Sequence, residues 1–271
     1  MEGSLFLPKD PMPSMTMPVT FPMRTFTLRA AMSFLVSAML LSGAALLRYV
    51  QQGNVGGAYS AGLSVIINFV AAYHYRAILK VRHAAQLNTA MSLRDEELEV
   101  DGLRHSDWLV TLPLLVLKLH YLIDNADQDL FFANAELSAF MAFLMILFGA
   151  FARLALDWGL KFGEMGDMQR IWVLGCYLVS IALLVVLLID LGMAQEGGST
   201  PSLIWSFFLV WIGYPIVAIG AFFARSTTKD GDSEVLSLFK DVSYALLDTY
   251  SKAVFAWWAA SLAFNIRFLG S

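Results

Sequence analysis

Asp248 and Lys252, near the end of the chain, have the types and the spacing of a buried ion pair or of a reactive amine with its counterion. They lie four residues apart in the apolar stretch YALLDTYSKAVFAWWAASLAFNI, so a helix would place the carboxylate one turn from the amine. A buried salt bridge stabilises weakly, because desolvation offsets most of the Coulomb attraction. A buried lysine can instead form a Schiff base with an aldehyde, whose cation then needs carboxylate counterions.

A second group of charges lies in LRHSDWLVTLPLLVLKLHYLI, Leu103 to Ile123. Arg104, Asp107, Thr111 and Lys118 fall near one face of a helix, and a charge at membrane depth is costly and usually functional. The structural alternative is an ion pair between an interfacial Arg104 and Asp107. Lys118 lies ~16 Å from Asp107 along such a helix, and no acid within one turn of it can neutralise it.

The composition is that of a membrane protein. The chain has 271 residues, of which 58% are hydrophobic and 15% charged, with a mean hydropathy of +0.63. Soluble domains carry more charge. A net charge of −4 without a basic patch argues against nucleic acid as a partner, and the single Cys176 excludes a disulfide framework. The sequence therefore predicts an integral membrane protein that has the lipid bilayer as its surroundings.

Seven stretches are long enough to cross the hydrocarbon core, which takes roughly 20 apolar residues. They are residues 26–49, 57–80, 104–123, 130–153, 171–193, 202–224 and 237–266. We expect an N-terminal tail over 1–25, one seven-helix domain over 26–267 and a short C-terminal tail over 268–271. Polar stretches separate the spans, the longest being residues 82–102. No internal repeat is evident, so an inverted-repeat transporter is not supported.

Four motifs resemble those of the microbial rhodopsins. RHSDWLVTLPLL is similar to their third helix, with its Arg-x-x-Asp-Trp-x-x-x-x-Pro-Leu pattern, and DTYSK to the Asp-x-x-x-Lys of their seventh. WIGYP resembles their sixth-helix Trp-x-x-Tyr-Pro, and AAYHY the second helix of proteorhodopsins and xanthorhodopsins. The resemblance covers about residues 26–267. It implies an all-α membrane protein, a seven-transmembrane-helix bundle with retinal on the seventh helix.

The resemblance also implies roles for the charged residues. Lys252 would bear all-trans retinal as a Schiff base. Asp107 would be the primary counterion and proton acceptor, and Asp248 the second counterion. Arg104 would sit beneath both carboxylates and hold them ionised. His74 would hydrogen-bond to Asp107.

The same resemblance implies that further residues surround the retinal. They are Trp108, Trp211, Tyr214 and Pro215 along the polyene, Tyr75 near the counterions, Leu115 at a colour-tuning position, and Trp172 and Gly175 at the ionone-ring end. Whether a carotenoid antenna binds beside Gly175 stays open at this point.

Function depends on three third-helix positions, which read Asp107, Thr111 and Lys118. In the family, aspartate at the first position is typical of proton pumps, whereas chloride pumps carry a neutral residue there and sodium pumps read Asn-Asp-Gln. Lysine at the third position, the proton donor, departs from the usual Asp or Glu, although a few proteorhodopsin-like pumps have it. The resemblance implies a light-driven proton pump and not an enzyme. If Lys118 stayed charged, the Schiff base would take its proton back slowly from water, and a slow-cycling photosensor acting through a partner would be the alternative. An unrelated seven-helix protein is the third hypothesis.

The direction of transport stays open, because two indicators of orientation disagree. Of the 18 lysines and arginines, Lys118 and Lys252 lie inside spans, which leaves fourteen on the face of the N-terminus against two, Arg48 and Arg267, on the other. The fourteen are Lys9, Arg24, Arg29, Arg76, Lys80, Arg82, Arg94, Arg104, Arg153, Lys161, Arg170, Arg225, Lys229 and Lys240. This bias predicts a cytoplasmic N-terminus, whereas the resemblance places it outside. The resemblance also implies a homo-oligomer, pentamer or trimer, in a plasma or inner membrane, with an organelle membrane not excluded.

Overall fold

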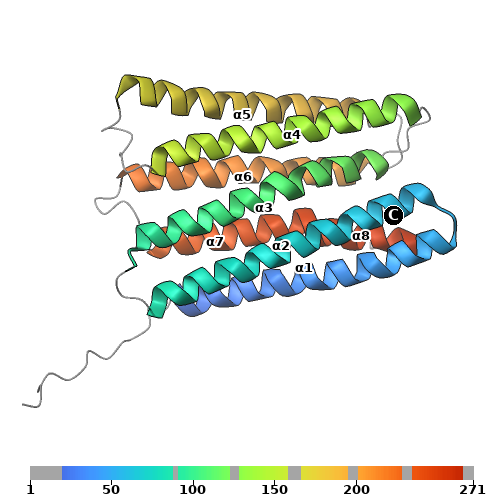
Figure 1. The fold of residues 1–271 in the computed structure, drawn as a ribbon, viewed down its shortest axis with the longest axis horizontal. Helices are drawn as coiled ribbons and strands as arrows, with labels where there is room; N and C mark the ends of the chain where they lie inside the picture. Colours follow the sequence, from blue (N-terminus) through green and yellow to red (C-terminus); the bar gives the residue numbers. More distant parts are fainter. Residues whose placement is uncertain are drawn as a thin grey trace, which may run out of the picture.

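The computed structural model describes residues 20–87, 91–122, 128–157, 166–194, 201–227 and 234–264, which are almost entirely helical. The helices are α1 (Thr20–Gln51), α2 (Val55–Leu87), α3 (Leu93–Leu122), α4 (Gln128–Asp157), α5 (Asp167–Ala194), α6 (Pro201–Thr227), α7 (Glu234–Asp248) and α8 (Phe255–Ala263), with a π-helical segment η2 (Thr249–Val254) between α7 and α8. Because α7, η2 and α8 follow one another without a break, the described helices form seven rods (Figure 1). The predicted all-α seven-helix bundle is confirmed.

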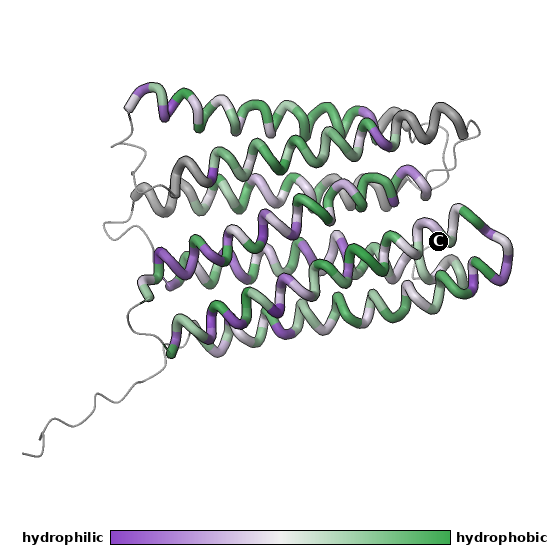
Figure 2. The backbone as a smooth tube through the Cα atoms, viewed as in Figure 1, coloured by the Kyte–Doolittle hydropathy of each residue, from purple (hydrophilic) through white to green (hydrophobic). Residues whose placement is uncertain are grey.

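Four helices are long and apolar enough to cross a membrane by length and composition alone: Phe21–Gln51, Val55–Leu87, Ala135–Arg153 and Asp167–Leu191. In α6 only the shorter segment Leu209–Ala221 qualifies as apolar. Hydrophilic residues gather toward one end of α2 and α3, whereas α5 is mostly hydrophobic (Figure 2). Helix α3 is less apolar because it carries charged side chains in the bundle interior, such as Asp107 and Lys118. Charged groups in membrane proteins usually face the bundle interior.

Several helices extend beyond the predicted spans. Residues 82–102 were expected to separate two spans, but α2 continues to Leu87 and α3 already begins at Leu93. The predicted tail over 1–25 also overlaps a helix, because α1 begins at Thr20. Most of that tail, and residues 268–271, lie outside the described residues. The physical reason for the longer helices is that their terminal charges find partners on neighbouring helices, as described below.

Small residues allow α1, α2 and the last rod to pack closely. Alanine is frequent among the buried residues at these contacts, as in many membrane helix interfaces, where close backbone approach replaces the hydrophobic effect as the source of attraction. The buried alanines are Ala31, Ala38, Ala45, Ala61, Ala71, Ala72, Ala245, Ala253, Ala256 and Ala260. This packing fixes the position of the last rod, which carries Lys252.

Lys252 lies within the π-helical segment. The backbone N–H of Phe255 donates to the carbonyl of Tyr250, five residues earlier, and also to that of Lys252. Short π-helical turns are rare and are often found at functional sites. The wider turn changes the direction of the side chains that follow, so it sets how Lys252 is aimed relative to Asp248.

Candidate functional site

The amine of Lys252 lies between the two predicted counterions. Its Nζ forms an ion pair with Oδ2 of Asp107 on α3 and another with Oδ1 of Asp248, at 2.9 Å. All three side chains are buried. The structure therefore brings together, across two helices, the three residues on which the sequence interpretation depends.

The two carboxylates differ in how they are held. Tyr75 donates a hydrogen bond to Oδ2 of Asp248 at 2.9 Å, and Tyr214 donates to Oδ1 at 2.8 Å. The indole N–H of Trp108 lies 3.4 Å from the same Oδ1. By contrast, Oδ1 of Asp107 has no hydrogen-bond partner among the residues that the structure describes. Asp248 is thus fixed by its donors, and Asp107 keeps an oxygen open to accept a proton.

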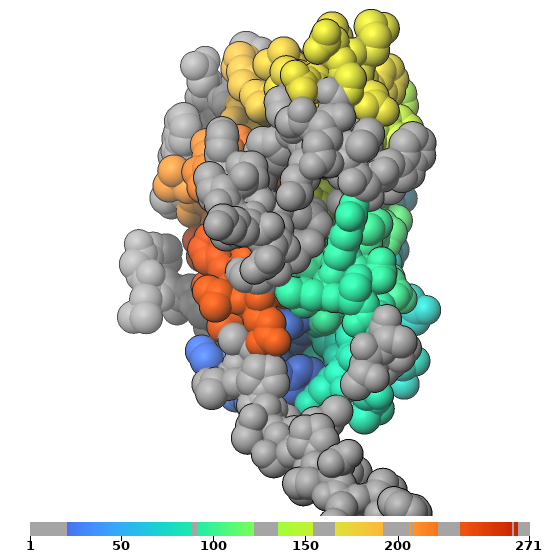
Figure 3. Space-filling model, turned by 90° about the vertical axis from the view of Figure 1, so that its left-hand side faces the viewer, coloured from blue at the N-terminus to red at the C-terminus, as the bar shows by residue number. Residues whose placement is uncertain are grey.

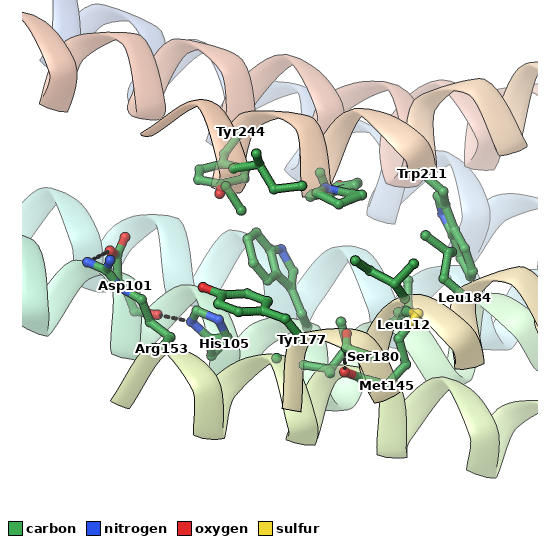
Figure 4. A pocket seen from close by; sticks show the side chains of 18 of the residues that line it. Asp101, His105, Leu112, Met145, Arg153, Tyr177, Ser180, Leu184, Trp211 and Tyr244 are labelled. Carbon is green, nitrogen blue, oxygen red and sulfur yellow. Dashed lines mark hydrogen bonds and ion pairs between the residues drawn. The ribbon is translucent and has the colours of Figure 1, made fainter. Parts of the chain in front are cut away.

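A cavity of about 580 Å³ runs between the helices, from Asp101 and Arg153 at one end to Leu112 and Trp211 at the other (Figure 4), and Lys252 is among its lining residues. Leu112, Met145, Leu184 and Trp211 line its apolar part. Pockets for small molecules typically measure ~300–1,000 Å³ and are mainly apolar. The cavity therefore fits a long apolar aldehyde such as retinal, attached at Lys252.

Most of the predicted wall residues do line this cavity. Trp108, Leu115, Trp211, Tyr214 and Pro215 are among its lining residues, and so is Thr111, which was predicted as a functional third-helix position and not as a wall residue. The rings of Trp108 and Tyr214 meet edge to face, with centroids 5.2 Å apart. Tyr75 contacts the counterion Asp248 instead of the cavity wall.

Trp172 and Gly175 were expected at the ionone-ring end, but neither is among the lining residues. The side chain of Trp172 is exposed on the outside of α5. The α5 residues that line the cavity include Tyr177, Ile181 and Leu184, whose spacing places them on one helix face. At 100° per residue, Trp172 and Gly175 fall outside that face, so neither lines the cavity in this structure, and their position near the ionone ring stays a prediction.

Arg104, one turn before Asp107 on α3, forms its ion pairs with acids other than the two counterions. It pairs instead with Oδ1 of Asp101 at 3.0 Å and with Asp241, and its guanidinium lies 5.0 Å from the ring centroid of Tyr244. No ion pair joins it to Asp107 or Asp248 in the described part of the chain. The expected contact of Arg104 with the two counterions is therefore not seen in the described structure, and its effect on their ionisation stays a prediction. The contact is missing because Arg104 pairs with Asp241, a fully buried carboxylate two turns before Asp248 on the same rod.

Arg104 belongs to a buried network of charges that the sequence interpretation missed. It joins five helices at the end of the bundle seen in Figure 3, where α3 and α7 lie side by side. Its members are Arg24, Arg82, Glu96, Glu97, Asp101, Arg104, Arg153, Lys240 and Asp241. The run DEELEVD at Asp95–Asp101 was the available signal, because helical spacing places Glu97, Asp101 and Arg104 near one face.

The acids of this network are held charged by their partners. Burial alone would raise the pKa of Glu97, but Lys240 and Arg82 outweigh burial and keep that pKa well below its usual range. The same balance acts on Asp101, where Lys240, Arg153 and Arg104 overcome the effect of burial and lower its pKa. Both carboxylates precede the predicted third span and are charged at neutral pH.

His74 lies beside Asp107 without the expected hydrogen bond. Its Nδ1 is 3.8 Å from Oδ1 of Asp107, and the same nitrogen lies 2.9 Å from the carbonyl oxygen of Val70. Its Nε2 is 3.1 Å from the hydroxyl of Ser106. The ring is therefore close enough to act on Asp107 electrostatically, but its nitrogens bond elsewhere in this conformation.

Lys118 points into the protein. It is 1% exposed, and its Nζ lies 4.4 Å from the ring centroid of Phe255, a cation–π contact. No carboxylate pairs with it among the described residues. An amine that reached the headgroups would be exposed, so the structure does not support a snorkelling Lys118.

The sequence matches the family model described as "Bacteriorhodopsin-like protein" over residues 26–266. Among solved structures, the chain is similar to xanthorhodopsin, a light-driven ion pump with dual chromophore, with 21% identity and a TM-score of 0.68 over 91% of this chain and 94% of that one. Thermophilic rhodopsin has 20% identity and a TM-score of 0.70, covering 90% and 93%. The proton-pumping rhodopsin of the marine alga Acetabularia acetabulum has 17% identity and a TM-score of 0.61, covering 90% and 96%.

No curated protein matches the sequence. At these identities the structural matches show the fold, and the family model covers most of the chain. The seven-helix fold and the apolar helices make it an integral membrane protein. The chain belongs to the bacteriorhodopsin-like family, the microbial rhodopsins.

Proposed function

We propose that this protein is a light-driven proton pump that carries all-trans retinal on Lys252. The observation that supports it most is the position of the Lys252 amine, paired with two buried carboxylates at the edge of an apolar cavity. Retinal, when bound, supplies the absorption of light and the change of shape that disturbs this ion pair. The remaining steps belong to the side chains.

Asp107 is the proton acceptor in this proposal. Its Oδ2 pairs with Nζ of Lys252, and its Oδ1 has no other partner in the described structure. A lone pair of the carboxylate takes the proton from Nζ, and the positive and negative charges of the pair disappear together. Asp248 stays in place because Tyr75 and Tyr214 both donate to it.

Lys118 is the proton donor on the opposite side of Lys252. Its ammonium would give up a proton toward Nζ of Lys252, become a neutral amine, and recover a proton from water. A buried lysine without a carboxylate partner favours the neutral amine more than an exposed one does, because burial penalises the charged form. The contact with the Phe255 ring offsets part of that penalty.

Transport is outward in this proposal, with the charged network on the outer side, as the family resemblance implies. The charge bias points the other way, but five of its fourteen cations are paired within the network: Arg24, Arg82, Arg104, Arg153 and Lys240. A paired, buried cation is less available to the anionic lipids and insertion machinery that the bias reflects. When these five cations are left out, nine lysines and arginines remain on the face of the N-terminus against two on the other face. The charge bias then disagrees less strongly with the family topology.

The test is a light-induced pH change in unbuffered cells that are supplied with retinal. Illumination should acidify the medium, a protonophore should abolish the change, and Asp107→Asn should abolish it without loss of the protein. Alkalinisation would show inward transport. Coloured cells without any pH change would favour the photosensor instead.

Two finer assignments belong to the same proposal. A carotenoid antenna beside Gly175 is favoured by open space on that face, since a Cβ added there would meet no atom within 4 Å and the nearby Trp172 and Leu178 are exposed. An action spectrum of pumping with carotenoid bands would support it, and one that follows retinal alone would contradict it. The homo-oligomer, pentamer or trimer, is tested by cross-linking in native membranes.

A further inference from the structure

A small cavity lies between α1, α2 and α8, apart from the retinal cavity. Ser42, Ser60 and Ser64 line it together with Tyr49 and several alanines. The hydroxyls of Ser42 and Ser60 are buried and have no hydrogen-bond partner among the described residues. Two such hydroxyls on one cavity need explanation, because buried polar groups in proteins are nearly always bonded to protein or to ordered water.

The size of the cavity agrees with one water molecule. Its volume is about 10 Å³, counted as the space open to the centre of a water molecule. That is about what one ordered water needs, provided that it also finds two to four polar partners. The two serine hydroxyls supply them. A metal ion is not favoured, because no carboxylate lines the cavity.

The cavity is part of a polar face of α2. Ser60, Ser64 and Asn68 follow one another at intervals of four residues, and each of the last two donates to the carbonyl of the one before, at 2.9 Å and 2.8 Å. The Oδ1 of Asn68 is also buried without a partner in the described structure. Seven residues further along the same face, Tyr75 donates to the counterion Asp248. The face thus leads from the cavity to the ion pair of Lys252.

The cavity lies at the depth of Lys118. Nδ1 of His74 on α2 and Oδ1 of Asp107 on α3 are 3.8 Å apart, so these two residues lie at the same height in the bundle. Ser64 is ten residues from His74, or ~15 Å along the axis, and Lys118 is eleven residues from Asp107, or ~16 Å. Because α2 and α3 run in opposite directions, both residues lie on the same side of the ion pair and at similar depth.

Tyr49 covers the cavity toward the α1–α2 turn. Its hydroxyl lies 3.4 Å from the carbonyl oxygen of Ala259, and its ring crosses Gly57 so closely that a Cβ there would come within 2.5 Å of the ring. The ring is partly exposed. Tyr49 therefore lies between the α1–α2 turn, at the end of the bundle opposite the charged network, and the buried serines.

We propose that this cavity binds an ordered water, and that the polar face of α2 is a hydrated route by which protons from the α1–α2 turn reach the depth of Lys118. Each water on such a route accepts a proton on its oxygen and releases one of its own, so no charge accumulates. The proton route rests on the proposed pumping function, whereas the water site does not.

The test uses the double variant Ser42→Ala/Ser60→Ala, which removes both orphan hydroxyls with little change of volume. The matched control is Ser37→Ala on the outside of α1, whose hydroxyl bonds only to the carbonyl of Phe34, at 2.8 Å. The first readout is the infrared O–H band of internal water in the dark protein, identified by its shift in H₂¹⁸O and measured with and without retinal. We expect the band in wild type and Ser37→Ala and its loss in the double variant.

The second readout is the recovery of the visible band after a flash. We expect it to slow by about tenfold in the double variant, since a hydrogen-bonded link is lost from the route, and to match wild type in Ser37→Ala. An unchanged water band overturns the water site. A lost band with unchanged recovery overturns the route. If retinal produced no colour at all, the proposed function would fail while the infrared result still decided the water site.

Discussion

Asp241 is a central acid of the charged network. It is fully buried and accepts from the guanidinium groups of Arg24, Arg82 and Arg104. We predict that Asp241→Asn destabilises the protein strongly. The amide keeps the size of the side chain but removes its negative charge and presents an N–H group to cations.

The expected magnitude follows from the charges of the network. It holds five cations and four anions, so its sum of +1 becomes +2 in the variant. Removing one partner from a buried ion pair typically costs roughly 3–5 kcal/mol, because the remaining charge stays buried. At ~2–4 °C per kcal/mol, the midpoint of thermal unfolding should fall by about 10 °C.

The assay is thermal loss of the visible absorption in detergent, with Asp167→Asn as the control. Asp167 is an exposed acid whose nearest cation, Arg170, is 3.8 Å away, so its loss should leave the midpoint unchanged. A double-mutant cycle with Arg104→Gln should show coupling, since the two side chains are in contact. Equal midpoints for Asp241→Asn and wild type would refute the view that this network stabilises the bundle.

Three further predictions concern the proton path and the network. Asp107→Asn should shift the visible absorption to the red and abolish the light-induced pH change, because an amide neither balances the cation at Lys252 nor takes its proton; pumping by this variant would remove Asp107 as acceptor. Lys118→Ala should slow the recovery of the visible band and make it fall about tenfold per pH unit, as expected when protons come from bulk water, and azide should restore it; flash data identical to wild type would remove the donor role. The pKa values of Glu97 and Asp101 are lowered in the folded protein, so the stability they provide is complete above their unfolded values and is lost as pH falls through the folded ones. Thermal stability should therefore be flat above about pH 5 and fall below about pH 4, less steeply in Glu97→Gln; a profile without an acid decline would contradict this.

The sequence was sufficient for the seven helices and for the centre of the site, because both depend on local patterns. Long apolar runs indicate spans, and the spacing of Asp248 and Lys252 on one helix needs no knowledge of the rest of the fold. Asp107 was placed opposite Lys252 by the family motif, and the structure joins the two.

What the sequence did not reveal depends on residues far apart in the chain. From its sequence, the polar run before the third span is expected to be a loop. In the structure it is the buried beginning of α3, because Glu97 pairs with Lys240, 143 residues later in the chain. The family resemblance placed Arg104 beneath Asp107 and Asp248, whereas the structure pairs it with Asp101 and with Asp241 on α7. The π-helical turn at Lys252 and the outward direction of Trp172 depend on backbone geometry that residue types do not encode locally.

The most direct test of the central claim is the absorption spectrum of the purified protein after addition of all-trans retinal, compared with that of Lys252→Ala. We predict a visible band in wild type that is absent in the variant, because Lys252 supplies the only amine that contacts both carboxylates and lines the cavity within the described structure. Lys118→Ala is the control, since it removes another buried amine and should keep the band. A visible band that persists in Lys252→Ala would contradict the account.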